Sequence, residues 1–401
     1  MTTDEVPRQR IVTRPTAMLL VTSVGAMSSF YLLMPVVPLY AADTGADGIG
    51  AGLATGALML GTVLAEFAVA RLLAGLGHRT VVGLGLLLLG VPALLLAARP
   101  PFTVVLAVCL FRGAGLGIVV VCGAALIGDL VPAERRGEGL GLYGLAVGVP
   151  SIACLPAGLW LQERFGFAPV FLLGAGPALV VLAAVTGLPA KSTRQEQHGS
   201  VFTALRDTDL ARPAFIFATI AMASGILLTF LPLAAGSAAT ALLVQSCATP
   251  LARWCAGRLG DRYDQGGLLL PSVLSAAVGT ALMVFVPHQG ALLAGMVLFG
   301  LGFGAAQNVT LSLMFARASR ANFGQVSVVW NLAYDAGIGI GAIGFGLLVH
   351  PLGHPTAFAL TAAVLFFSLI PAIKDRRKSD DGHHALLGFA GRLQRRSPDQ
   401  P

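Results

Sequence analysis

The sequence alternates between long apolar runs and short polar segments. Twelve runs approach the roughly 20 residues that a helix needs to cross the hydrocarbon core of a membrane. The first six are residues 16–40, 49–72, 80–98, 102–126, 139–161 and 168–189, and the last six are 213–234, 237–256, 267–287, 290–315, 325–349 and 354–373. The pattern predicts an all-α membrane protein with twelve transmembrane helices.

A polar segment separates the two sets of six runs. We expect an N-terminal six-helix bundle over residues 1–189, a cytoplasmic linker over 190–212, a C-terminal six-helix bundle over 213–373 and a basic tail over 374–401. The seam between the seventh and eighth runs is the least marked, because only "PLAAGS" around Pro232 supplies a turn there. The tail could lie as a short amphipathic helix on anionic lipid or stay without structure.

The composition agrees with a lipid environment. Of the 401 residues 56% are hydrophobic and 11% are charged, and the mean hydropathy is +0.80. Soluble domains carry about 25% charged residues. We therefore expect a multi-pass protein of the inner or plasma membrane. The first apolar run lacks a convincing cleavage site and is interpreted as a retained span, not a signal peptide.

The basic residues fall on one side of the predicted topology. All of the 26 lysines and arginines except Arg99, Arg112 and Arg164 lie in the tails and loops on the side that carries the N-terminus. The positive-inside rule places that side in the cytoplasm, with the C-terminus. The net charge of +7 is spread over short loops, so we expect contact with membrane lipids and none with nucleic acid.

The two halves repeat. The shift that brings Gly113 onto Gly300 also brings Arg71 onto Arg258 and Gly137 onto Gly324. Two halves of six spans that run in the same direction are related by a pseudo-twofold axis along the membrane normal. The sequence therefore predicts two pseudo-symmetric bundles.

Three motifs carry a resemblance to a known family. These are "RGAGLG" in the fourth run, "DLVPAERRG" after it, and "GRLGDR" between the eighth and ninth runs. Together with the architecture they resemble the major facilitator superfamily over roughly residues 15–375, most closely its bacterial efflux-type branches. The resemblance implies alternating access, in which two bundles rock about a central cavity that holds a small-molecule substrate. The chain has no Walker sequence and its glycine patterns fall inside the spans. We therefore expect no enzyme activity and no cofactor, and we expect a monomer.

Two charged residues near the middle of predicted spans are candidates for transport chemistry. A charge at that depth is costly unless it meets a partner or water, so Arg112 should face the cavity or a carboxylate. The resemblance implies that it assists proton exchange or binds an anionic group; the alternative is a structural arginine bonded to backbone carbonyls. Asp335 is the candidate proton carrier, with Asn331 one turn before it and Tyr334 beside it. Its alternative role is a polar clamp between the second and eleventh spans.

Further polar residues could line the pathway or join helices. Glu66 is interpreted as a partner of a loop arginine at the cytoplasmic gate, with a second titrating group as the alternative. The others are Tyr31, Gln245, Gln307 and Asn308. The five cysteines lie inside apolar runs without ligand spacing, so we expect neither disulfides nor a metal site.

A cluster of loop residues resembles the gate of the family. In the second half it contains Gly257, Arg258, Asp261 and Arg262, and in the first half Arg71, Asp129, Arg135 and Arg136. The resemblance implies that Asp261 faces the positive N-terminal end of the fifth span. In the first half the repeat places Ala74 at the position of Asp261, so the gate is predicted to be asymmetric.

The sequence thus predicts a secondary transporter, with proton-coupled export of a small amphipathic compound as the leading hypothesis. The fifth span, "GLAVGVPSIACLPAGLWL", departs from the glycine and proline pattern of the antiporter branches. Uptake of a polar metabolite remains the alternative. A sensor that binds solute without moving it is the third possibility.

Overall fold

The structure is a computed structural model, and it describes residues 12–132, 135–190, 207–260, 265–319 and 322–375. Every regular element in these ranges is helical. The first half contains α1 (Arg14–Leu33), α2 (Val36–Ala41), the π-helix η1 (Ala42–Ala46), α3 (Asp47–Leu95), the short 3₁₀-helix η2 (Leu96–Ala98), α4 (Phe102–Leu130), α5 (Arg136–Phe165), α6 (Phe167–Val180) and η4 (Val181–Gly187). The second half contains α8 (Thr208–Ala234), α9 (Ala238–Gly260), α10 (Gln265–Leu282), η5 (Met283–Phe285), α11 (Gln289–Arg317) and α12 (Phe323–Phe367).

Glycine breaks divide the two longest helices. The backbone of α3 leaves helical geometry at Gly77 (φ 76°, ψ 165°), and that of α12 at Gly353 (φ 74°, ψ 164°). Positive φ is open to glycine at little steric cost. Each break lies where the sequence predicts a loop, so α3 holds the second and third predicted spans and α12 holds the eleventh and twelfth.

Eight helical stretches in the described part of the chain are long and apolar enough to cross a membrane. Two of them, Arg14–Ala98 and Phe323–Asp375, contain more than one predicted span. The all-α membrane fold is therefore confirmed. The number of twelve spans and the cytoplasmic position of the termini stay predictions.

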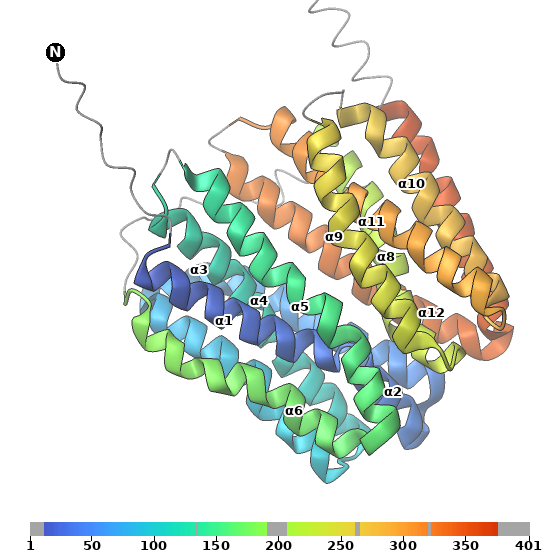
Figure 1. Cartoon of the computed structure of the whole chain (residues 1–401), viewed down its shortest axis with the longest axis horizontal. Coiled ribbons are helices and arrows are strands. Elements are labelled where there is room, and N and C mark those ends of the chain that lie inside the picture. The colour runs from blue at the N-terminus through green and yellow to red at the C-terminus, as the bar shows by residue number, and fades with distance from the viewer. Residues whose placement is uncertain (1–11, 133–134, 191–206, 261–264, 320–321, 376–401) are drawn as a thin grey trace, which may run out of the picture.

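The helices form two groups that follow the order of the chain. Figure 1 shows α1 to α6 on one side of the molecule and α8 to α12 on the other. Within the groups, α3 packs along α4 and α12 along α8. Between the groups, α3 contacts α12 and α5 contacts α9. These two helix pairs make most of the interface at which a pathway between the halves would lie, and α8 adds contacts with α2 and α3.

Small residues bring α3 and α12 together near one end of the interface. A Cβ atom on Gly52 would lie 2.4 Å from the backbone oxygen of Ala342, and one on Gly346 would lie 2.8 Å from the oxygen of Gly48. Such close backbone approach is typical of small residues at helix contacts in membranes. The halves are tightly packed at the end that carries Gly48 and Gly346.

The other ends of the second and eleventh predicted spans, which lie within α3 and α12, are not packed in this way. A Cβ atom on Gly75 of α3 or on Gly324 of α12 would meet no described atom within 4 Å. These ends carry the basic loops. The interface is therefore closed at the end away from the basic loops, while the two glycines at the basic end face open space.

Candidate transport site

Two acidic side chains from opposite halves meet at the interface. The carboxyl groups of Glu66 in α3 and Asp335 in α12 lie within hydrogen-bonding reach of each other. Asp335 is buried, and Oε1 of Glu66 is buried without a hydrogen-bond partner among the described residues. Two carboxylates in contact repel each other when both are charged, and a shared proton removes that repulsion. A single shared proton would therefore stabilise the contact, which also fits the alternative role of Asp335 as a polar clamp between the second and eleventh spans.

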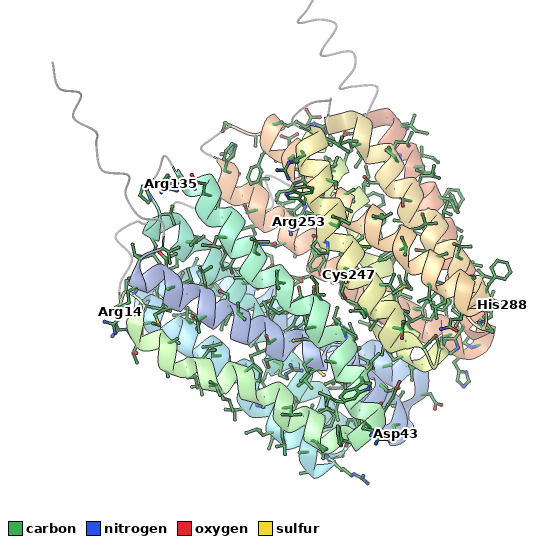
Figure 2. The ribbon with its side chains drawn as sticks, in the orientation of Figure 1. Arg14, Asp43, Arg135, Cys247, Arg253 and His288 are labelled. Atoms are coloured by element: carbon green, nitrogen blue, oxygen red, sulfur yellow. The ribbon has the colours of Figure 1, made fainter. Side chains whose placement is uncertain are left out.

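An arginine that the sequence analysis did not single out lies near this pair. Arg253 of α9 donates a hydrogen bond from Nη1 to Oε1 of Gln307 in α11, at 3.3 Å. Its guanidinium is also within electrostatic range of the hydroxyls of Tyr31 in α1 and Tyr334 in α12. In the view of Figure 2, Arg253 lies on the side of α9 toward the N-terminal half. Arg253 therefore belongs to the space between the halves.

The internal repeat of the sequence could have identified Arg253 as a candidate site residue. The shift that superposes Arg71 on Arg258 also places Glu66 on Arg253. The two halves thus present opposite charges at equivalent positions of equivalent helices. Tyr31 connects them, because its hydroxyl is within electrostatic range of both Arg253 and Asp335.

Aromatic rings of the second half form a stack next to Asp335. The ring of Tyr334 is nearly parallel to that of Trp330 at a centroid distance of 6.3 Å, and to that of Phe217 at 5.8 Å. Trp330 and Phe217 are stacked at 4.5 Å, and Phe303 extends the group. Tyr334 and Trp330 are only partly buried, so the stack offers flat apolar surface beside the polar groups.

The prediction that Arg112 faces the cavity or a carboxylate is wrong. Its side chain is fully buried (0% exposed) inside the N-terminal half. Nε donates to the backbone oxygen of Leu89 at 3.1 Å, and Nη2 donates to that of Ser29 at 3.2 Å. No carboxylate pairs with it among the described residues. Arg112 connects α4 with α1 and α3, and these contacts fit the alternative structural role.

Of the remaining candidate residues, some lie at the interface and others pack inside the second half. Gln307 contacts Arg253, whereas the amide of Asn308 packs on the backbone of Gly257 in α9. Gln245 is buried, and its Oε1 has no partner among the described residues. Asn331 is half-buried on α12, one turn before Asp335.

The predicted gate lies partly outside the described residues. Asp261 and Arg262 are not described, and neither is the side chain of Arg136. The guanidinium carbon of Arg258 lies 3.8 Å from the ring centroid of Trp254, in a cation–π contact. The gate centred on Asp261 therefore stays a prediction.

Of the first-half members of the gate, Arg71, Asp129 and Arg135 are described, and they lie at or near the surface. Arg71 and Asp129 are exposed, and Asp129 is within electrostatic range of His78. Arg135 forms a bidentate ion pair with Glu138 in the first turn of α5, at 3.2 and 2.8 Å. Hydrogen bonding to Glu138 raises the pKa of Arg135 above its ordinary value. Glu138 is a partner that the sequence did not reveal.

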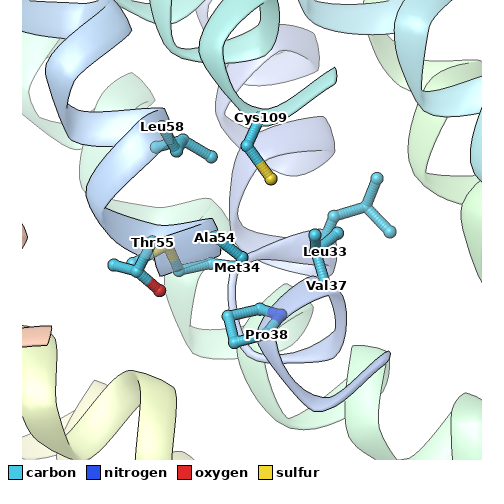
Figure 3. A pocket seen from close by; sticks show the side chains of 8 residues that line it. All are labelled: Leu33, Met34, Val37, Pro38, Ala54, Thr55, Leu58 and Cys109. Carbon is cyan, nitrogen blue, oxygen red and sulfur yellow. The ribbon is translucent and has the colours of Figure 1, made fainter. Parts of the chain in front are cut away.

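A small pocket lies near the closed end, between α1, α2, α3 and α4. Its lining residues are Leu33, Met34, Val37, Pro38, Ala54, Thr55, Leu58 and Cys109, shown in Figure 3. The lining is apolar apart from Thr55 and Cys109. Nothing in the pocket would orient a charged group, so the polar residues at the interface are the better candidate site.

Comparison with known proteins places these features in a family. Residues 19–342 match the family described as the Major Facilitator Superfamily. The Bacillus subtilis protein described as an uncharacterized MFS-type transporter, YtbD, is 21% identical over 339 residues, which cover 80% of this chain and 85% of that protein. The quinolone resistance protein NorA of Staphylococcus aureus is 24% identical over 200 residues, about half of each chain (49% and 51%).

A solved structure has a similar fold. It is a bacterial homolog of the human lysosomal transporter Spinster in an inward-facing, unoccupied conformation, with a TM-score of 0.73 and 14% sequence identity. The likeness covers 91% of this chain and 96% of the other. At this identity the likeness concerns the fold alone.

Proposed function

Because this chain belongs to the Major Facilitator Superfamily, and is therefore a multi-pass transporter of the cell membrane, we propose that it works by alternating access and exports a small amphipathic compound in exchange for protons. The contact between Glu66 and Asp335 carries this proposal. Each half contributes one carboxyl group, so the protonation of the pair and the relative position of the halves are linked.

The linkage follows from electrostatics. With one proton shared, the two carboxyl groups attract each other and favour contact between α3 and α12. When the proton leaves, two like charges in a poorly solvated interface repel and favour separation. A proton that binds from one side and leaves on the other can then drive a change between the two conformations.

The packing of the interface supports alternating access. The halves are close at the end that carries Gly48 and Gly346, and the pair lies between this end and the basic loops. If the basic loops are cytoplasmic, as their charge predicts, this is an inward-open arrangement. Protons would then reach Glu66 and Asp335 from the cytoplasm in this state.

The proposed direction of transport rests on a relative. The partial similarity to the quinolone resistance protein NorA favours export of an amphipathic compound. The departure of α5 from the antiporter pattern, with Pro150 and Pro156 inside the helix, keeps uptake of a polar metabolite as the second candidate. Binding without transport is the third.

The test is transport by the purified full-length protein in liposomes against a broad compound panel, with and without a pH gradient. We expect a gradient to drive accumulation of at least one amphipathic compound. Asp335→Asn and Glu66→Gln should keep counterflow, which needs no net proton movement, and lose the response to the gradient. Glu163→Gln, which neutralises an exposed carboxylate at the end of α5, should behave like wild type.

Three other results would count against the proposal. A gradient response that persists in both Asp335→Asn and Glu66→Gln removes the acid pair from coupling. Gradient-independent uptake of a polar metabolite favours the second candidate. Stabilisation by a compound without any flux favours the sensor.

A further inference from the structure

We propose that Arg253 binds an acidic group of the substrate, and that the transported compounds are therefore aromatic organic anions, such as small arylcarboxylates. This inference rests on the proposed transport function and specifies its substrate class. It follows from the partners of Arg253, from the aromatic surface beside it and from the position of the acid pair.

No carboxylate among the described residues balances the charge of Arg253. Its described hydrogen bond goes to the neutral side chain of Gln307. The titratable groups within electrostatic range are the hydroxyls of Tyr31 and Tyr334, and no described carboxylate forms an ion pair with it. A cation inside a membrane protein is costly without a counter-charge or water. A bound anion would supply the counter-charge.

The described acids at the contact between α3 and α12 are engaged with each other. Glu66 and Asp335 contact each other, so neither is used by Arg253. In this proposal the interface holds two separate sites: the acid pair between α3 and α12 binds the proton, and Arg253 on α9, which no described carboxylate pairs with, binds the substrate. Arg258, one turn or so further along α9, is held over Trp254 and does not compete for the same role.

The geometry of arginine favours a carboxylate. The guanidinium has five N–H donors in a planar fork, and one of them reaches Gln307. The others remain for a bidentate contact with a carboxylate, which is stronger and more selective than a bond to a neutral acceptor. The same positive charge disfavours a cationic compound at this position.

The aromatic stack would bind the apolar part of the ligand. Tyr334 lies within range of Arg253 and belongs to the parallel group with Trp330 and Phe217. Trp330 is held in place by a hydrogen bond from Nε1 to Oγ1 of Thr310, at 3.1 Å. A planar ring next to a carboxylate would stack on this surface while its acidic group reaches Arg253.

Three naphthalene probes that differ in charge test the inference. They are 1-naphthoate, 1-naphthamide and 1-naphthylmethylammonium, each measured by counterflow in liposomes that contain the full-length protein. We expect wild type to exchange the anion best and the cation least. Arg253→Gln should lower naphthoate exchange by about tenfold or more, because a charged hydrogen bond is lost, and should leave naphthamide nearly unchanged.

Further variants separate binding from folding. Arg253→Lys keeps the charge but not the fork, so we expect partial naphthoate exchange. Arg164→Gln removes an exposed arginine at the end of α5 and should match wild type. Naphthoate should raise the thermal midpoint of purified wild type and Arg164→Gln but not of Arg253→Gln, which shows whether a folded variant has lost the site.

The inference is overturned if the ammonium probe is exchanged best, if Arg253→Gln exchanges naphthoate at the wild-type rate, or if none of the probes is exchanged. The proton-coupling proposal survives each of these results, because it is tested with whichever panel compound responds to a pH gradient. Conversely, naphthoate exchange that depends on Arg253 but ignores the gradient supports the anion site and rejects coupling.

Discussion

The hydroxyl groups of Thr55 in α3 and Thr229 in α8 lie 2.8 Å apart and form a buried hydrogen bond between the two halves. The bond lies on the closed side of the interface, because Thr55 is within a turn of Gly52 on α3. It adds a directional contact to a surface where backbone atoms and apolar side chains pack closely. Opening of this end must break it.

Loss of this bond should favour the conformation that is open at this end. Thr55→Val keeps the shape of the side chain and removes the hydroxyl, and a buried hydrogen bond is worth about 1 kcal/mol. We expect the population open at this end to rise about fivefold. Spin labels at Asp43→Cys and His350→Cys, in a background where exposed Cys247 is serine, would report the distance across this end.

A double-mutant cycle provides the control. Thr55→Val and Thr229→Val should have similar effects, and the combination should add little, because each variant already removes the same bond. Fully additive effects would show that the two hydroxyls act separately.

The glycine contact between α3 and α12 gives a second prediction. Gly52→Ala places a methyl group 2.4 Å from the oxygen of Ala342, so the helices must move apart. Overpacking of this kind costs about 1–3 kcal/mol, and we expect a lower thermal midpoint and slower transport. Gly75→Ala is the matched control on the same helix: it enters open space and should gain about 1 kcal/mol of helix propensity. Equal loss in both variants would contradict the tight packing at Gly52.

Replacement of Arg112 separates its structural role from a transport role. Arg112→Met keeps most of the side-chain volume and removes a buried charge that has no described carboxylate partner. Because substitution of a buried charged group by an apolar one of similar size is often neutral or stabilising, we expect a folded protein with unchanged substrate preference. Arg112→Ala should be less stable by about 2–5 kcal/mol, since it also leaves a cavity. Measurements of the thermal midpoint and of counterflow decide this: a well-folded Arg112→Met protein that cannot transport would restore the functional role.

An ion pair in the second half gives a prediction about stability. Arg317 at the end of α11 makes a bidentate contact with Asp375, at 2.8 and 2.7 Å, and Nη1 also donates to the backbone oxygen of Asp209. Asp375 is 1% exposed. Asp375→Asn should therefore cost about 3–5 kcal/mol, because one partner of a buried pair is lost.

The exposed pair of Arg135 and Glu138 is the control for this measurement. Its side chains are 33% and 59% exposed, and such pairs contribute at most about 1 kcal/mol. Thermal unfolding in detergent should show a clear loss for Asp375→Asn and little change for Glu138→Gln. A chain truncated before Asp375 should resemble Asp375→Asn, and normal stability of that truncation would argue against the pair.

The sequence by itself determined the helices. In lipid every backbone polar group needs an internal partner, so an apolar run of sufficient length has to be helical. The breaks at Gly77 and Gly353 occur where polar or turn-forming residues interrupt the runs, and the repeat that joins Glu66 to Arg253 was visible in the residues. The family could also be inferred from local motifs, because the residues of each motif are adjacent in the sequence and no tertiary contact is needed to recognise them.

Only the tertiary structure decided which side chains meet. Glu66 and Asp335 are far apart in the sequence, and their contact depends on how α3 lies along α12. Arg112 faces backbone oxygens, not the interface, because the rotation of α4 about its axis is set by packing against α1 and α3. Arg253 lies within electrostatic range of Tyr31 for the same kind of reason. An apolar run fixes the length of a helix, but its direction and rotation come from the neighbours against which it packs.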